Sequence, residues 1–193
     1  MDCLGDDDCV VDQTFLWTDS INTFSTQHLG FRDFTVILSN FMFDVSVFGL
    51  FLLYYLDVFH SVQIFITITF NSAFKTFIEN YAFQMSKPKG FIWYFPGLYS
   101  LVCPSFDIDD FYFSGHVAIA VTCTLILYKV SQRHPDKMAF KYAFRFWVLI
   151  GLPYLWGLLT ILYAHFVIDM LSALAIATLS MRLSEKVSYY GEV

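Results

Sequence analysis

The sequence predicts an all-α membrane protein: a bundle of about five transmembrane helices, preceded by an amphipathic helix that lies in the membrane interface. Composition is the first observation behind this prediction. Of the 193 residues, 57% are hydrophobic and only 15% are charged, and the mean hydropathy is +0.57. Soluble domains carry charge on about a quarter of their residues. The second observation is a series of apolar runs, each long enough to cross all or most of a ~30 Å hydrocarbon core.

The N-terminal segment, residues 1–33, is acidic and precedes the first long apolar run. Between residues 14 and 30, side chains recur at helical spacing at Trp17, Ile21, Phe24 and His28, and Gly30 suits a helix C-cap. We therefore expect a short amphipathic helix that lies in the interface and does not cross the membrane.

The transmembrane domain covers residues 34–183 and is followed by a short polar tail, residues 184–193. At about 1.5 Å per residue, five apolar runs are long enough to span. These runs are residues 34–56, 61–79, 111–130, 144–162 and 166–183. Because the connections after the first and fourth runs are tight, a merged or re-entrant pair of helices is an alternative at either place.

Residues 80–110 contain three prolines, two glycines, two lysines and Trp93, which is typical of a structured loop at the membrane surface. Five spans place this loop, the N-terminus and the starts of the third and fifth spans on one side of the membrane, here called side A. The opposite side is called side B.

Basic residues orient the bundle. Side B receives Lys129, Arg133, Lys137, Lys141, Arg145, Arg182 and Lys186, whereas side A receives Arg32, Lys75, Lys87, Lys89 and most of the acidic residues. The positive-inside rule then assigns side B to the cytoplasm or to a mitochondrial matrix. Side A would face a lumen, the exterior or an intermembrane space.

Ionisable groups at two helix starts are the candidate functional residues, because such groups are costly at membrane depth. His165 and Asp169 are four residues apart, so they share a face of a helix and their side chains can meet. A carboxylate that orients one imidazole nitrogen leaves the other as a nucleophile or base. His116, beside Ser114 and Gly115, can act as the complementary general acid. This pattern suits transfer of a phosphorylated group.

The motifs Phe113-Ser114-Gly115-His116-Val117 and His165-x-x-x-Asp169 resemble the superfamily of lipid phosphatases and phosphotransferases that includes the type 2 phosphatidic acid phosphatases. They are most similar to sphingomyelin synthases and to plant phosphatidylcholine:diacylglycerol cholinephosphotransferases. The resemblance covers roughly residues 75–183. It implies that His165 forms a phosphohistidine, that Asp169 orients His165, and that His116 protonates the departing diacylglycerol.

The chain departs from the phosphatase branch at its basic positions. Leu159 stands six residues before the nucleophilic histidine, where that branch has arginine, and Lys87 leads to Phe95-Pro96 without an arginine. A simple phosphatase is therefore not expected. The candidates for phosphate or headgroup binding are Lys75, Lys87, Lys89, Trp93 and Tyr112. Aromatic faces among them suit a choline-type headgroup.

Two functions follow from these observations. The first is a lipid headgroup phosphotransferase that uses a phosphohistidine and acts on phospholipid with diacylglycerol or ceramide, in the ER or Golgi as the resemblance implies. The alternative is a catalytically silent descendant that binds lipid as an accessory subunit of a larger membrane complex, for example a respiratory complex of the mitochondrial inner membrane. The cysteines fit no zinc spacing, so neither function calls for a metal or cofactor. The net charge of −6 argues against a nucleic-acid partner.

Polar pairs inside the predicted spans suggest contacts between helices. Asn40 and Asp44 are four residues apart in the first span, and Asn71 and Lys75 are four apart in the second. Polar side chains often bridge transmembrane helices, so a structural role, such as an Asp44–Lys75 pair, is expected for them.

Overall fold

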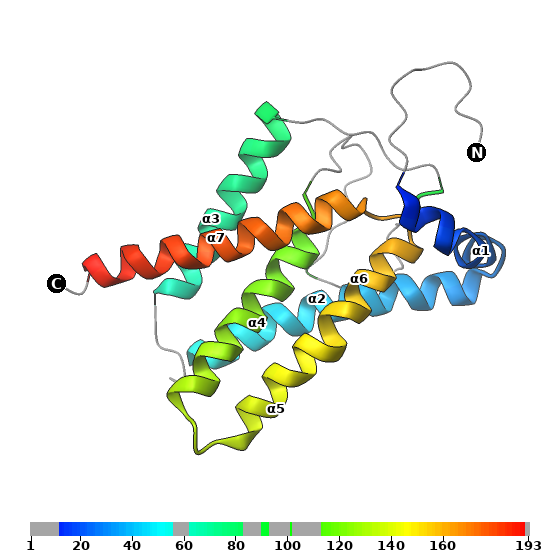
Figure 1. Ribbon diagram of the computed structural model, residues 1–193. Coiled ribbons are helices and arrows are strands. Elements are labelled where there is room, and N and C mark those ends of the chain that lie inside the picture. The colour runs from blue at the N-terminus through cyan, green and yellow to red at the C-terminus, as the bar shows by residue number, and fades with distance from the viewer. Residues whose placement is uncertain (1–11, 56–61, 83–89, 93–100, 102–112, 192–193) are drawn as a thin grey trace.

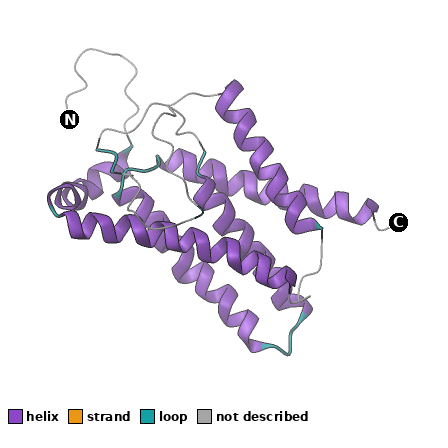
Figure 2. Cartoon of the chain, turned by 180° about the vertical axis from the view of Figure 1, so that it is seen from behind, coloured by secondary structure: helices purple, strands orange, loops and turns teal. Residues whose placement is uncertain are grey.

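The computed structural model describes residues 12–55, 62–82, 90–92, 101 and 113–191. Every regular element in these ranges is a helix, which confirms the all-α fold class (Figures 1 and 2). Most of the predicted surface loop, residues 80–110, lies outside the described ranges.

The helices follow one another with short connections wherever the connection is described. In chain order they are α1 (Gln13–Gln27), α2 (Leu29–Tyr55), α3 (Gln63–Phe77) with the π-helical turn η1 (Ile78–Ala82), α4 (Gly115–Arg133), α5 (Met138–Phe146), the π-helical turn η2 (Trp147–Gly151), α6 (Leu152–Ile161) and α7 (Val167–Gly191). The predicted polar tail is therefore helical as far as Gly191.

Helix α4 lies at the centre of the bundle and packs against α2, α3, α5, α6 and α7 (Figure 1). Its central place explains its composition. Small and hydroxylated residues of α4 are buried, among them Ala118, Ala120, Thr122 and Thr124, and a helix surrounded by protein needs no lipid-facing apolar surface. The same composition makes α4 less apolar than α2, α3 and α6.

Three stretches of helix are long and apolar enough to cross a membrane, namely Leu29–Tyr55, Met138–Ile161 and Val167–Ser188. They correspond to the first, fourth and fifth predicted spans and are compatible with an integral membrane protein. Of the five predicted spans, the other two lie on α3 and α4 and stay predictions, as does the placement of α1 in the interface.

The helix boundaries differ from the predicted ones for local reasons. Gly30 does not cap α1: the N–H of His28 donates to the carbonyl of Phe24, so α1 ends there and Gly30 lies in the first turn of α2. The fourth apolar helix begins at Met138 and not at residue 144, and it passes through the π-helical turn η2 just before Pro153. Proline lacks the N–H that a regular α-helix needs, so a wider turn next to it relieves the mismatch.

Two apolar clusters form the core, one at each end of α4. The first surrounds the start of α4 and includes Val117, Leu155, Leu159 and Met170. The second surrounds its end and includes Leu50, Ile64, Ile126 and Trp147. A third, small cluster of Phe15, Tyr163 and Phe166 attaches α1 to the connection between α6 and α7.

Candidate functional site

The two motif histidines come together in space. His116 lies in the first turn of α4, and His165 lies in the connection just before α7. Their ring centroids are 6.4 Å apart. Phe43 of α2 contacts His116 edge to face, with the ring centroids 5.1 Å apart. Helix α2 therefore also contributes a side chain to the site. The starts of α4 and α7 thus place two imidazoles within reach of one small group.

Asp169 lies beside His165, as predicted, but the two residues do not share a helix face, because His165 precedes the start of α7. One carboxylate oxygen, Oδ2, is 3.7 Å from Nδ1 of His165, and the side chain of Asp169 is fully buried. The same oxygen accepts a hydrogen bond of 2.8 Å from the backbone N–H of Phe166. Asp169 therefore fixes the backbone next to His165 and places its negative charge near the ring, at a separation longer than a hydrogen bond.

Ser114 and Gly115 shape the start of α4. The Ser114 side chain is fully buried and caps the helix, because its hydroxyl accepts from the N–H of Val117 at 3.4 Å. A Cβ added at Gly115 would meet no described atom within 4 Å, so the described residues leave space at the start of α4, next to His116 in the chain. The positive end of the α4 dipole lies at this end of the helix, which favours an anionic group there.

The electrostatic environment of His165 keeps its ring neutral. Burial, and then the positive charge of Lys75 on α3, lower the pKa of His165 to about 4. A neutral imidazole has the free electron pair that a nucleophile needs. Among the candidate phosphate-binding cations, Lys75 is the one whose charge lowers the pKa of His165.

Helix α1 holds the segment that carries His165. The carboxylate of Asp12 caps α1 through one oxygen, which accepts from the N–H of Thr14 at 2.9 Å. Its other oxygen accepts from the N–H of Val167 at 2.6 Å and so caps α7 as well. Two consecutive N–H groups at the start of α7 are therefore satisfied by carboxylates. Asp169 accepts from Phe166, and Asp12 accepts from Val167.

Two more long-range contacts fix the connection between α6 and α7. The Asn22 amide donates to the carbonyls of Gly90 and Ile161, at 3.1 and 2.8 Å. Tyr163 has a positive φ of 51°, and its hydroxyl donates to the carbonyl of Phe15 at 2.6 Å. Its ring stacks on that of Phe15 with the centroids 4.2 Å apart. An unfavourable backbone conformation two residues before His165 is thus held by surrounding contacts.

Other predicted site residues have different outcomes. Lys87, Lys89, Trp93 and Tyr112 lie outside the described residues. Leu159 is fully buried in the apolar cluster around the start of α4, so its position could not accept an arginine without burying a charge.

The sequence analysis did not identify the three residues that hold the segment around His165 in place, which are Asp12, Asn22 and Tyr163. Asp12 had one local signal, since an aspartate just before a helix is a frequent N-cap. Its bond to Val167 had none, because the two residues are 155 positions apart.

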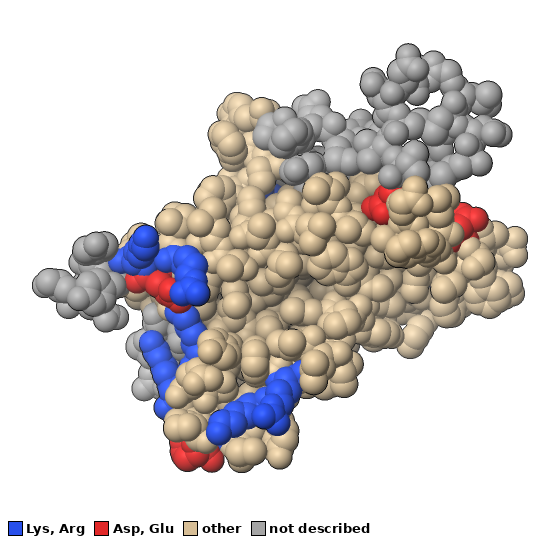
Figure 3. Space-filling view, in the orientation of Figure 1, with Lys and Arg blue, Asp and Glu red and all other residues tan. Residues whose placement is uncertain are grey.

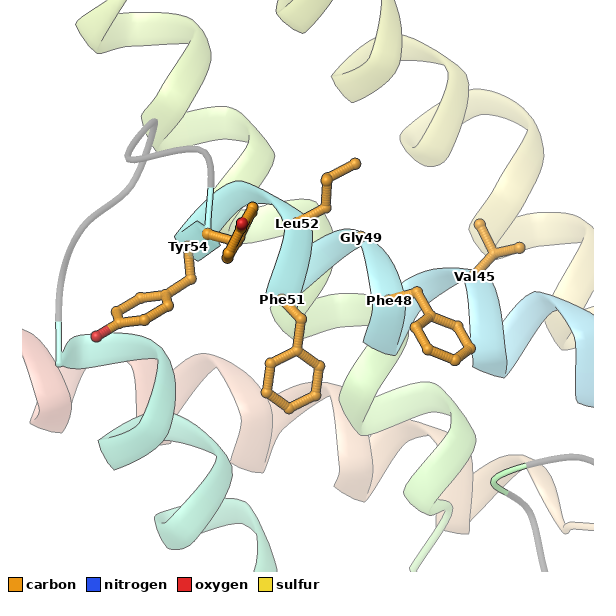
Figure 4. Close-up of a pocket in the computed structure, with 7 residues that line it drawn as sticks. Val45, Phe48, Gly49, Phe51, Leu52 and Tyr54 are labelled. Atoms are coloured by element: carbon orange, nitrogen blue, oxygen red, sulfur yellow. The ribbon is translucent and has the colours of Figure 1, made fainter.

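An apolar groove elsewhere on the surface is separate from this site. It has a volume of about 710 Å³ and is lined by the second half of α2 (Figure 4). Its lining residues are Val45, Phe48, Gly49, Phe51, Leu52, Tyr54 and Tyr55. Among the described residues, no group of three or more histidine, cysteine and acidic side chains could hold a metal ion.

Figure 3 shows how charge is distributed on one face of the molecule. Lysine and arginine gather where α4 ends, α5 begins and α7 ends, while acidic side chains also lie near α1. The histidines lie at the opposite ends of α4 and α7 from this basic region. The site is thus a pair of neighbouring imidazoles with a buried carboxylate, next to the start of a helix.

No known protein family, curated protein or solved structure matches the chain.

Proposed function

We propose that the chain is a lipid headgroup phosphotransferase whose catalytic residues are His116, His165 and Asp169. The observation that carries the proposal is the approach of the two histidine rings, with centroids 6.4 Å apart, at the open start of α4. A phosphate group bound between the rings would contact one nitrogen of each, at the separations that general acid–base and nucleophilic catalysis require.

The reaction has two balanced steps. In the first, a ring nitrogen of neutral His165 attacks phosphorus in a phospholipid, the bond from phosphorus to the diacylglycerol oxygen breaks, and protonated His116 gives its proton to that oxygen. In the second, His116 takes the proton of an acceptor lipid hydroxyl, the resulting oxygen attacks phosphorus, and His165 is released.

Lys75 and the start of α4 would stabilise the phosphate. The charge of Lys75 is felt at His165, where it contributes to the lowered pKa. At the start of α7, the carboxylates of Asp12 and Asp169 accept from N–H groups. At the start of α4 the N-cap is the neutral hydroxyl of Ser114, so no carboxylate offsets the positive helix end there. Preorganised positive groups of this kind stabilise the charge that develops on phosphoryl oxygens.

In the membrane, the basic ends of α4, α5 and α7 would face the cytoplasm or the mitochondrial matrix. The histidines would lie near the opposite surface, at the depth of lipid headgroups. The substrates would be a phospholipid donor and diacylglycerol or ceramide, supplied from the bilayer. Five spans, with α4 crossing at the centre of the bundle and α3 beside it, and an interfacial α1 complete this arrangement. By its resemblance the chain belongs in the ER or Golgi.

Turnover of short-chain fluorescent phosphatidylcholine with ceramide or diacylglycerol, by protein purified in detergent, tests the proposal. The change of His165 to Ala should abolish turnover, since no nucleophile remains. The matched control is His134→Ala, because His134 follows the far end of α4. Equal turnover in wild type and His165→Ala would overturn the proposal.

One observation favours the second candidate, a catalytically silent lipid-binding subunit of a larger complex. Leu159, where the phosphatase branch has arginine, is fully buried among apolar residues, so the described site holds no guanidinium at that position. Purification from native membranes separates the two candidates. A subunit would co-purify in fixed ratio with other membrane proteins, whereas the enzyme would be active alone.

A further inference from the structure

One face of α3 is polar along its whole length although most of it is buried. Gln63, Thr67 and Asn71 recur every four residues, with exposed fractions of 4%, 0% and 4%, and Lys75 follows at the same spacing. Residues four apart lie on one side of a helix. This face packs against α7 and α4 and so lies inside the bundle (Figure 1).

The neighbouring helices add polar groups at each turn of this face. At the basic end, Lys129 of α4 donates to the Gln63 side chain at 3.2 Å and forms an ion pair with Glu185 of α7. One turn further, the hydroxyls of Thr67 and Ser184 are 2.7 Å apart.

One more turn toward the histidines, the Asn71 amide donates to the hydroxyl of Thr122 at 3.0 Å. The positive charge of Lys75, at the next position on this face, lowers the pKa of His165. We call this set the polar column: Gln63, Thr67, Asn71 and Lys75 of α3, Thr122 and Lys129 of α4, and Ser180, Ser184 and Glu185 of α7.

The polar column contains buried atoms whose hydrogen-bonding capacity the described residues leave unused. Asn71 Oδ1 and Ser180 Oγ have no hydrogen-bond partner among the described residues, and both side chains are at least nine-tenths buried. Buried polar atoms in this situation are normally satisfied by ordered water. Successive levels are four residues, about 6 Å, apart along α3, a distance that one bridging water spans.

We propose that the polar column is a hydrated proton-transfer path between the Lys129–Glu185 pair and the His165–Asp169 pair. Along α7 from Glu185 to Asp169 the path covers about 24 Å, most of a hydrocarbon core. Ionisable residues with hydroxyls and amides between them, inside a membrane bundle, are typical of proton relays. The path is a function beyond the proposed phosphotransfer and does not depend on it.

Transfer along the path conserves bonds and charge. A proton from solution enters at the Lys129–Glu185 pair, and each water or hydroxyl then accepts one proton and donates another to the next. The last one protonates the His165–Asp169 pair, which releases a proton to the opposite solution. The transmembrane difference in proton potential drives the transfer. The direct contacts of 2.7 to 3.0 Å between helices hold the polar groups too close together for a hydrated ion to pass.

Proton flux into liposomes of phosphatidylcholine and phosphatidylglycerol tests the path. The full-length protein is reconstituted with a trapped pH-sensitive dye, and a potassium diffusion potential set with valinomycin drives the protons. Wild-type protein should accelerate flux over protein-free liposomes. Thr67→Val should lower the accelerated flux by about tenfold or more, the rate equivalent of one interrupted polar contact. Thr67→Ser should restore it.

Thr69 provides a matched control for Thr67. Both lie on α3 and both hydroxyls donate to the carbonyl four residues earlier at 2.8 Å, but Thr69 is exposed. Thr69→Val should therefore keep wild-type flux. Ser180→Ala covers the case in which Thr67→Val misfolds, because it removes a buried hydroxyl without a described partner and should not destabilise the fold.

Flux in Ser180→Ala should nevertheless fall. Wild-type flux equal to that of protein-free liposomes, or unchanged flux in both Thr67→Val and Ser180→Ala, would overturn the path. Phosphotransfer plays no part in this assay, so its result is separate from that of the lipid assay.

Discussion

Asp12 joins two helices that are distant in sequence, so its replacement should destabilise the fold around His165. Its carboxylate accepts from the N–H and the hydroxyl of Thr14, at 2.9 and 2.7 Å, and from the N–H of Val167, at 2.6 Å. The loss of an N-cap costs roughly 0.5–2 kcal/mol. A hydrogen bond to a charged group contributes roughly 1.5–3 kcal/mol. Because Asp12 is only partly buried, we expect Asp12→Ala to lower the free energy of unfolding by about 3 kcal/mol.

The size of the effect should depend on what replaces the carboxylate. Asn caps helices about as well as Asp, so Asp12→Asn keeps the α1 cap and loses only the charge at α7, at a cost of roughly 1–2 kcal/mol. Equilibrium unfolding in mixed micelles, followed by circular dichroism, measures both variants. Asp136, exposed in the turn between α4 and α5, provides the control Asp136→Ala. A loss below about 0.5 kcal/mol for Asp12→Ala, the range of ordinary surface changes, would refute the double-cap interpretation.

Four further predictions concern His165 and the residues around it. Because the pKa of His165 is lowered from 6.5 to about 4, its ring stays neutral as the pH falls, and the acid limb of the turnover profile should lie near pH 4 and not near 6.5. The unfolded chain takes up this proton near pH 6.5, so the contribution of His165 to stability should decline between pH 6.5 and pH 4, which unfolding at several pH values measures. Gly90→Ala should lower the thermal midpoint, since Gly90 has a φ of 90° and an added Cβ would lie 2.9 Å from the Tyr163 ring; an unchanged midpoint would contradict this packing. Leu159→Arg should prevent stable folding and not restore phosphatase activity, because the side chain would be buried in the apolar cluster; expression yield and phosphatidic acid hydrolysis test it.

The fold class and the approximate positions of the helices followed from the sequence because apolar runs are a strong signal. The ends of the helices did not, since they depend on local bonds. The bond from His28 to Phe24 ends α1 before Gly30, and a π-helical turn joins α5 to α6 where a single span was expected to begin at residue 144. Neither feature has a distinct sequence pattern.

The ionisable residues of the candidate site could be picked out from the sequence, whereas the contacts that hold them in place could not. His116, His165 and Asp169 are recognisable because ionisable residues are rare in apolar surroundings and because the last two are four apart. The contacts of Asn22 with Ile161 and of Tyr163 with Phe15 join residues 139 and 148 positions apart. Single-sequence reasoning has no local pattern from which to infer such pairs.

The covalent state of His165 tests the proposed phosphotransfer most directly. Wild-type protein is incubated briefly with short-chain phosphatidylcholine without an acceptor lipid, and its peptides are analysed by mass spectrometry under conditions that preserve phosphoramidate bonds. The account predicts a phosphocholine adduct on His165, its absence in His165→Ala, and its loss when ceramide or diacylglycerol is added. No adduct, or an adduct on another residue while turnover proceeds, would contradict the account.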